Sequence, residues 1–457
     1  MTGILNAAEK EEININVILS PAWLNSSPNC CLDIYNEYKN RNNIKGWLVK
    51  DEPQYWEWGD VFAGGEHIWN QLTMGYGLLS SLDCDRLVMF NLCALDYEKN
   101  DEGKWDVNLG EGTKQQRKNL MGSCENYAEY LDVMQKLFDP KIWSYDVYPI
   151  SYLNSNYAKV LAPATSYNTK IEYKRFYKYL SIFSRKAKDT KHPFWSFGMT
   201  AAHVWHDENG NVTSGFPAPA EGMLKFEILS ALAYGAQGIV YYQFSKSESI
   251  KTNGQIISHY EYGDAPLTWN QDESNDADKG FVKTQVFEVV KKVNTLVKFW
   301  KTYFLGCKVL TCVHAKRSFT GTSPVTHLAC IKNISISGKE SVEKQRDGVL
   351  LSWFQNSVVL SETTEPITRN YIAIVNHDPF NPQKVTMHMD TAAGAQRILA
   401  PSQAIVPTTG KDMKLNNTTG YPIGPVLTDI VFTLEPGGME MIYWDNEVDY
   451  DIPGYSD

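Results

Sequence analysis

The chain has 457 residues, of which 43% are hydrophobic, 12% aromatic and 21% charged, and its formal net charge is −10. This composition is ordinary for a globular protein, and the length suffices for one large domain and a smaller one. Nucleic acid and anionic membranes are not expected as partners, because both select clustered lysine and arginine and the chain has no such run.

The first 304 residues alternate between apolar runs and segments with helical spacing. Strands are predicted at residues 14–20, 46–53, 86–92, 142–150, 192–203 and 238–245. Helices are predicted at residues 66–82, 117–137, 173–188, 221–237 and 281–304. Continuous apolar strands that alternate with helices indicate a parallel sheet covered on both faces.

Two architectures fit this alternation: a doubly wound sheet and a (β/α)8 barrel. The glycine-rich dinucleotide fingerprint follows none of the predicted strands, which weakens the doubly wound alternative. Polar and acidic residues close nearly every strand, and barrel enzymes keep their chemistry at that end. We therefore predict an α/β fold with a (β/α)8 TIM-type barrel over residues 1–304.

From about residue 305 the pattern changes to short alternating strands separated by turn residues. These strands are predicted at residues 307–315, 348–355, 370–378, 383–390, 429–438 and 439–444. The pattern is typical of an antiparallel β-sandwich, which we predict over residues 305–457 as a buttress for the barrel or a sugar-binding module. The polar segment 245–278 is expected to be a surface excursion from the last barrel strand.

Glu52 lies at the end of the second predicted strand, and Trp56 and Trp58 come soon after it. An acid in an apolar, aromatic setting has its charged form disfavoured, so its pKa should rise. A raised pKa suits the residue with which a glycosidase protonates a leaving oxygen. The alternative is an acidic loop residue in an ordinary salt bridge, but the position at a strand end favours catalysis. Asp51, Trp56 and Trp58 are the candidate substrate contacts beside it, although tryptophans also fill cores.

Further polar residues end other predicted strands. Asp146 is a candidate second carboxylate or substrate ligand, with a hydrogen bond at the barrel rim as the alternative. Asn91 could donate to a sugar hydroxyl or cap the next loop. Tyr148, His203 and Gln243 are candidate substrate contacts at the ends of their strands.

Metal and disulfide chemistry are not expected. None of the eight cysteines forms CxxC, and no His/Cys cluster has the spacing of zinc ligands. His203 and His206 lack a third ligand as a metal pair. Buried free thiols are favoured over a bridge between Cys307 and Cys312, and no cofactor is predicted.

The strand-end residues and their order resemble a known family. The stretches DEP, SYDVYP, PFWSFGMTAAH and LKFEILSALAYGAQGIVYYQF are similar to clan-A glycoside hydrolases, in the β-galactosidase-like branch and its bacterial relatives. The resemblance covers roughly residues 14–304, and a C-terminal sandwich also fits it. It implies a glycosidase that hydrolyses O-glycosidic bonds of oligo- or polysaccharides without a cofactor, and a carbohydrate as the partner.

The family places its general acid/base glutamate at the end of the fourth barrel strand and its nucleophile at the end of the seventh. With residues 238–245 as the eighth strand, the fourth is 46–51 and Glu52 follows it. The seventh strand region, WSFGMTAAH, has no carboxylate. Three alternatives stay open: a nucleophile from elsewhere, an inverting mechanism in which Asp146 or another acid activates water, or sugar binding without catalysis. The candidates for a nucleophile from elsewhere are Asp146, Asp207 and Glu208.

The same strand count makes residues 14–20 the third strand. The thirteen residues before it cannot hold two βα units of about 30 residues each, so we expect either a fragment or an incomplete barrel. The first residues lack the basic start and apolar core of a signal peptide. A preceding segment would fit the periplasmic or secreted location that the resemblance implies. No run of about 18 apolar residues occurs, so no membrane span is predicted.

Overall fold

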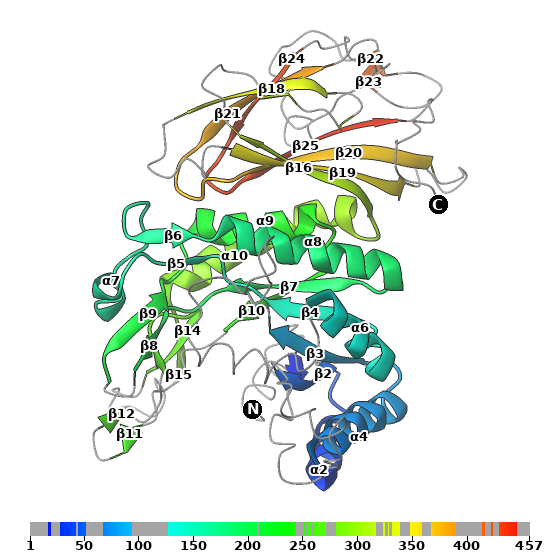
Figure 1. The fold of residues 1–457 in the computed structure, drawn as a ribbon, viewed down its shortest axis with the longest axis vertical. Helices are drawn as coiled ribbons and strands as arrows, with labels where there is room; N and C mark the ends of the chain where they lie inside the picture. The colour runs from blue at the N-terminus through cyan, green and yellow to red at the C-terminus, as the bar shows by residue number, and fades with distance from the viewer. Residues whose placement is uncertain are drawn as a thin grey trace. The chain divides into compact units, whose positions relative to one another are not determined.

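The computed structural model divides into two compact units, and Figure 1 labels their helices and strands. The first holds residues 1–147 and 177–197, and the second holds residues 148–176 and 198–457. The residues described are 17–19, 28–42, 44–51, 67–93, 127–207, 210–243, 251–252, 255–256, 260–270, 280–316, 323–324, 328, 331–338, 348–358, 367–389, 414–415, 422–423 and 429–445.

The first unit is built on parallel strands that pair in the order of the chain. These are β1 (Val17–Leu19), β2 (Ile44–Asp51), β3 (Leu87–Cys93), β4 (Trp143–Asp146) and β7 (Phe194–Met199). The helices between them are α2 (Pro28–Tyr38), α4 (His67–Leu82), α6 (Tyr127–Phe138) and α8 (Tyr173–Thr190). Because the strand order never reverses, the sheet has no topological switch point of the kind that defines a doubly wound fold.

Alternation along β4 separates an apolar face from a polar one. Trp143 Nε1 donates to Thr190 Oγ1 of α8 at 3.0 Å, and the Tyr145 ring stacks on Phe183 of α8 with centroids 4.0 Å apart. Successive strand residues point to opposite faces. Ser144 and Asp146 therefore point to the face of the sheet away from α8.

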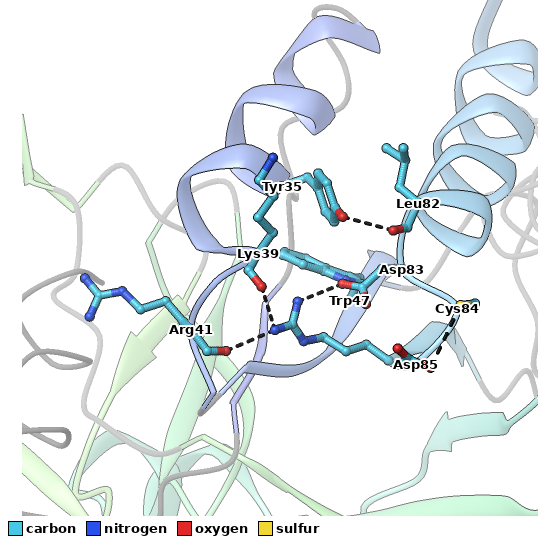
Figure 2. A network of polar contacts seen from close by, with 9 residues as sticks. Tyr35, Lys39, Arg41, Trp47, Leu82, Asp83, Cys84 and Asp85 are labelled. Carbon is cyan, nitrogen blue, oxygen red and sulfur yellow. Dashed lines mark hydrogen bonds and ion pairs between the residues drawn. The ribbon is translucent and has the colours of Figure 1, made fainter.

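A polar network links the loop between α2 and β2 to the loop that precedes β3 (Figure 2). The buried Asp83 carboxylate accepts from Trp47 Nε1 at 2.9 Å and from Arg86 Nη1 at 2.8 Å. Arg86 Nη2 donates to the carbonyls of Lys39 at 2.7 Å and Arg41 at 3.1 Å. The network lies at the amino ends of β2 and β3, where barrel-type folds keep stabilising contacts rather than chemistry.

The second unit contains the next strand and two long helices. Strand β10 (Gly238–Tyr242) follows β7 in the strand order, and it is preceded by helix α9 (Glu221–Ala233) and followed later by α10 (Gln285–Phe304). Helix α9 is buried on all sides from its third residue onward, which is typical of a helix enclosed by other elements. Thr284 caps the amino end of α10, because its side-chain oxygen accepts a hydrogen bond from Val286 N at 3.1 Å.

Segments that follow β4, β7 and β10 pack together in the second unit. The elements are β5 (Ile150–Tyr152), α7 (Ser155–Lys159), β6 (Thr169–Ile171), β8 (His203–His206), β9 (Val212–Phe216), β11 (Lys251–Thr252), β12 (Gln255–Ile256), β13 (Tyr260–Tyr262), β14 (Leu267–Asn270) and β15 (Gly280–Lys283). Strand β8 pairs antiparallel with both β9 and β13, and α7 and β5 pack against β9. These excursions follow the carboxyl ends of successive parallel strands.

The predicted β-sandwich is confirmed as two four-stranded antiparallel sheets (Figure 1). One contains β16 (Lys308–Lys316), β19 (Gly348–Val358), β20 (Ile367–Asn376) and β25 (Met439–Asp445). The other contains β17 (Ser323–Pro324), β18 (Ile331–Gly338), β21 (Gln383–Met389) and β24 (Asp429–Leu434), and β22 (Lys414–Leu415) and β23 (Pro422–Ile423) form a separate pair. Apolar side chains of both sheets, such as Ile334, Leu351 and Ile372, fill one shared core.

The sandwich docks onto α9 through backbone contact and an ion pair. Lys225 of α9 contacts Glu435 at 2.6 Å and Glu221 at 2.7 Å. Gly437 has φ +60°, and a Cβ there would collide with the carbonyl oxygen of Gly222. A Cβ on Gly222 would in turn collide with the carbonyl oxygen of Pro379. Two glycines therefore allow α9 and the sandwich loops to touch backbone to backbone.

Two predicted strands are each divided in the structure. The segment 142–150 contains β4, which ends at Asp146, and β5, which begins at Ile150 and pairs with β6. Within the segment 192–203, the parallel strand β7 ends at Met199, and the antiparallel strand β8 begins at His203. Of the predicted helix 117–137, the structure describes the part from Tyr127 onward. Among the described helices, none is long and apolar enough to cross a membrane.

Candidate functional site

Polar residues from β3 and β4 lie on the sheet face away from α8 in the first unit. Ser144 Oγ donates to Asn91 Oδ1 at 3.2 Å, and Asp146, two residues further along β4, shares the face of Ser144. We call Asn91, Ser144 and Asp146 the polar row. In the strand register, Asp51 lies opposite Asn91 and Cys93 lies opposite Asp146. The end of β2 therefore lies beside Asn91 of β3, and β3 and β4 end beside each other.

The polar row differs in burial along its length. Asn91 is 1% exposed and Ser144 is equally buried, so their hydrogen bond satisfies polar groups inside the sheet. Asp146 is half-buried at the end of β4. A sugar contact by Asn91 and a catalytic or ligand-binding role for Asp146 both stay predictions.

Several predicted site residues lie outside the described part of the chain. These are Glu52, Trp56, Trp58 and Glu208. Glu52 directly follows Asp51, the last residue of β2. The backbone of Asp51 is described through its register with Asn91. The roles of Glu52, Trp56, Trp58 and Glu208 therefore remain predictions.

Five ring-bearing residues form a second group, in the second unit. We call Tyr148, His203, Trp205, Phe216 and Tyr242 the aromatic cluster. The rings of His203, Trp205 and Phe216 lie pairwise 4.9 Å apart by centroid. Tyr148 lies 5.6 Å from Phe216 and 6.0 Å from Tyr242. All except His203 are half-buried, so their rings retain surface for a ligand.

The β8–β9 hairpin explains why this cluster forms. His203 lies opposite Phe216 in the antiparallel register, and alternation puts His203 and Trp205 on one face of β8. Val204 points to the other face, where it joins a small core with Tyr152 and Ala158. One face of the hairpin is thus structural, and the other carries the aromatic cluster.

Burial sets the protonation of His203. The residue is 5% exposed, and loss of hydration lowers the pKa of its imidazole to about 4, although a hydrogen bond with the Ala201 backbone acts to raise it. The ring is therefore neutral at pH 7. A neutral imidazole offers one donor and one acceptor, which suits a hydroxyl-bearing ligand.

Gln243 is tied to the same region through Thr200. Thr200 N donates to the Tyr242 carbonyl at 2.6 Å, and Thr200 Oγ1 donates to the Gln243 carbonyl at 3.0 Å. The peptide bond between Tyr242 and Gln243 is cis. The structure thus brings together three residues that the sequence predicted separately: Tyr148, His203 and Gln243.

The acids near the end of β7 have structural partners. Asp207 accepts from Asn211 N at 2.8 Å and from Asn211 Nδ2 at 3.2 Å, which holds the turn between β8 and β9. Glu227 of α9 is 3% exposed and accepts from Met199 N at 2.9 Å. Burial raises the pKa of Glu227 to about 8, while the bond from Met199 acts to lower it.

Sequence reasoning missed Trp205, Phe216 and Glu227. The first two carried a signal, because Asn209-Gly210 between two alternating segments is typical of a β-hairpin. Glu227 is the one acid of α9 beyond its first residue, and an acid among mainly apolar side chains indicates a buried group with a specific polar partner. Within the described residues, no group of three His, Cys, Asp or Glu side chains could hold a metal ion.

Comparisons with known proteins give remote likenesses. No family model matches the chain, and no curated protein matches it. Among solved structures it is similar to an alpha-L-fucosidase from Bacteroides thetaiotaomicron VPI-5482, with 7% identity and a TM-score of 0.32, over 61% of this chain and 64% of that one.

Two further solved structures are beta-galactosidases. One is from the psychrophilic Marinomonas ef1, with 9% identity and a TM-score of 0.32, over 61% of this chain and 43% of that one. The other is a catalytic mutant of a GH42 enzyme from G. stearothermophilus, with 10% identity and a TM-score of 0.41, over 93% of this chain and 82% of that one. The chain spans less than two thirds of the fucosidase and of the Marinomonas enzyme.

Proposed function

We propose that the protein is a glycoside hydrolase that acts on O-glycosidic bonds of oligo- or polysaccharides. The observation that carries this proposal is the polar row, which ends in the half-buried Asp146 at the carboxyl end of β4. Barrel-type enzymes use side chains at this end of the strands. The unreversed strand order supports a (β/α)8-type domain over residues 1–304, followed by a β-sandwich domain over residues 305–457.

In the proposed mechanism Glu52 is the general acid/base. It follows β2, whose last residue lies opposite Asn91 of the polar row. Glu52 would protonate the leaving oxygen, and Asp146 would act as the second carboxylate. Depending on whether the two carboxyl groups lie about 5–5.5 Å or about 6.5–9.5 Å apart, Asp146 would attack the sugar or activate water.

The aromatic cluster is the proposed carbohydrate-binding surface of the second unit. Half-buried rings present apolar faces that suit the C–H faces of pyranose rings, and His203 and Gln243 supply uncharged hydrogen-bonding groups. Burying these ring faces against a sugar would stabilise binding by the apolar area removed from water. Trp56 and Trp58 are proposed as further contacts beside Glu52.

The test compares two acids of one short segment. Glu52→Gln is expected to lower kcat on glycosides whose leaving group is a second sugar about 10²–10⁴-fold, the usual contribution of a general acid. Glu57→Gln removes a charge five residues later and is expected to leave kcat within about twofold. Circular dichroism of both variants checks the fold. Undiminished turnover by Glu52→Gln would refute the assignment.

A second candidate function is sugar binding without hydrolysis. It is favoured by the end of β7, where Asp207 is the only acid among residues 198–207 and is held by Asn211. Titration calorimetry that detects glycan binding, with no reducing sugar released by wild-type protein over days, would select this alternative.

A further inference from the structure

The buried carboxyl of Glu227 contacts the end of β7, the strand that precedes the aromatic cluster in the chain. Glu227 sits in the buried part of α9, is 3% exposed, and accepts from Met199 N, at the end of β7, at 2.9 Å. An acid enclosed by apolar side chains costs stability unless a polar partner compensates for its lost hydration. A leucine would fill this place in α9 without that cost. The presence of an acid here therefore points to a role beyond filling space.

The close packing of α9 on β7 brings the carboxyl to the backbone. A Cβ at Gly198 would lie 2.8 Å from Ile228 Cδ1 and 3.2 Å from Leu224 Cδ1. Both contacts are tighter than ordinary van der Waals distances, so glycine at this position lets the helix approach the strand. The approach puts the Glu227 carboxyl within hydrogen-bonding distance of the next residue, Met199.

Hydrogen bonds hold Thr200 and Ala202, which follow Met199. Thr200 N and Oγ1 donate to the carbonyls of Tyr242 and Gln243 at 2.6 and 3.0 Å. Ala202 N donates to the Asp264 carbonyl at 2.8 Å. His203 of the aromatic cluster follows immediately. The bond from Met199 to Glu227 is therefore the first of a series that ends at the proposed sugar-binding surface.

The charged groups around Glu227 have partners of their own. On α9, Lys225 contacts Glu221 and Glu435, and Glu221 also contacts Lys292 of α10 at 3.1 Å. On β10, the Tyr241 phenol donates to Asn294 at 2.6 Å. The causes of the raised pKa of Glu227 are its burial and, acting against it, the Met199 bond.

We propose that Glu227 is a positioning residue, which fixes the end of β7 and thereby holds His203, Tyr242 and Gln243 in their ligand-binding arrangement. The inference rests on the proposed function, because it takes the aromatic cluster as the carbohydrate surface. Glu227 does not touch the ligand in this account. It acts through the peptide group of Met199.

Two variants of similar size separate this role from simple packing. Glu227→Gln keeps an oxygen that accepts from Met199 N, whereas Glu227→Leu keeps volume and removes the acceptor. We expect Glu227→Leu to raise the amide exchange rate of residues 199–203 at least tenfold and to weaken glycan binding about tenfold, the effect of about 1.4 kcal/mol. Glu227→Gln should keep both within about twofold. Wild-type exchange in Glu227→Leu would overturn the proposal, as would equal losses in both variants.

The readouts also separate this inference from the proposed function. Wild-type protein that binds no member of a glycan panel would overturn the proposed function, and amide exchange would still decide whether Glu227 holds β7. If Glu227→Leu does not unfold cooperatively, Glu227→Met takes its place, because it also keeps volume and removes the carboxyl acceptor. Exchange at residues 199–203 should then be at least tenfold faster in Glu227→Met than in Glu227→Gln. Equal exchange in these two variants would overturn the proposal.

Discussion

Burial shifts the pKa values of two side chains near the end of β7 in opposite directions. It lowers the pKa of the His203 imidazole to about 4 and raises the pKa of the Glu227 carboxyl to about 8. The physical cause is the same, because a poorly hydrated site disfavours whichever form carries the charge. At pH 7 both groups are therefore predominantly neutral. This part of the protein is suited to a ligand recognised through hydroxyls and apolar faces rather than through charge.

The titration of His203 follows from its burial. Its imidazole signal in a proton NMR spectrum, assigned by its loss in His203→Gln, should stay constant from pH 8 to pH 5.5 and shift as pH falls through about 4. Since the folded pKa lies below the ordinary 6.5, His203 contributes stability above pH 6.5 that is lost as pH falls through the folded value. A midpoint near 6.5 would contradict the buried, neutral ring.

The placement of Tyr148, His203 and Gln243 in one region of the second unit could be anticipated, because each follows or begins a strand-end segment. Their roles as substrate contacts remain predictions. The partners Trp205 and Phe216 depend on the register of a hairpin, which single-residue reasoning does not supply. Asn91 was predicted as a sugar contact, and its bond to the buried Ser144 could not be foreseen without the strand register.

At the scale of elements, Gly437 and Gly222 determine how the sandwich meets α9. Gly437 combines φ +60° with backbone contact to Gly222, whereas Gly306 has φ +75° and open space where a Cβ would be. Both positions penalise alanine through left-handed backbone, by about 1–2 kcal/mol. Only Gly437 adds a collision, which forces the sandwich loop and the helix apart.

The matched pair Gly437→Ala and Gly306→Ala tests this contact. We expect Gly437→Ala to lower the free energy of unfolding by about 1–3 kcal/mol more than Gly306→Ala, which is the usual effect of overpacking. Urea unfolding of both variants, followed by circular dichroism, measures the difference. Equal losses would mean that the loop relaxes freely and that the backbone contact is not needed.

The elements predicted best are those with long apolar runs. Strands β2 and β3 and helices α4, α8 and α10 lie close to their expected positions, because periodic burial is written into their sequences. Strands β4 and β5 were predicted as one, since the apolar pattern continues across Pro149 while the pairing partner changes. Helix α2 and the β8–β9 hairpin were not predicted, because short elements with mixed polarity carry weak periodic signals.

At the scale of the molecule, the order of the parallel strands is the main link between sequence and proposed function. Strands β1, β2, β3, β4, β7 and β10 follow one another in the sheet as in the chain. Excursions after β4, β7 and β10 then supply the hairpins and loops of the second unit. In folds of parallel strands, the segments at the carboxyl ends of the strands are where ligand sites are usually built.

In the proposed mechanism Glu52 donates a proton to the leaving group during glycoside hydrolysis. The most direct test measures kcat/KM of wild type and Glu52→Gln on two substrates with the same sugar, one leaving as a dinitrophenolate and one as a second sugar. A good leaving group needs little protonation, so the variant should lose at least about 100-fold more activity on the sugar-linked substrate. Equal losses on both substrates would contradict Glu52 as the proton donor.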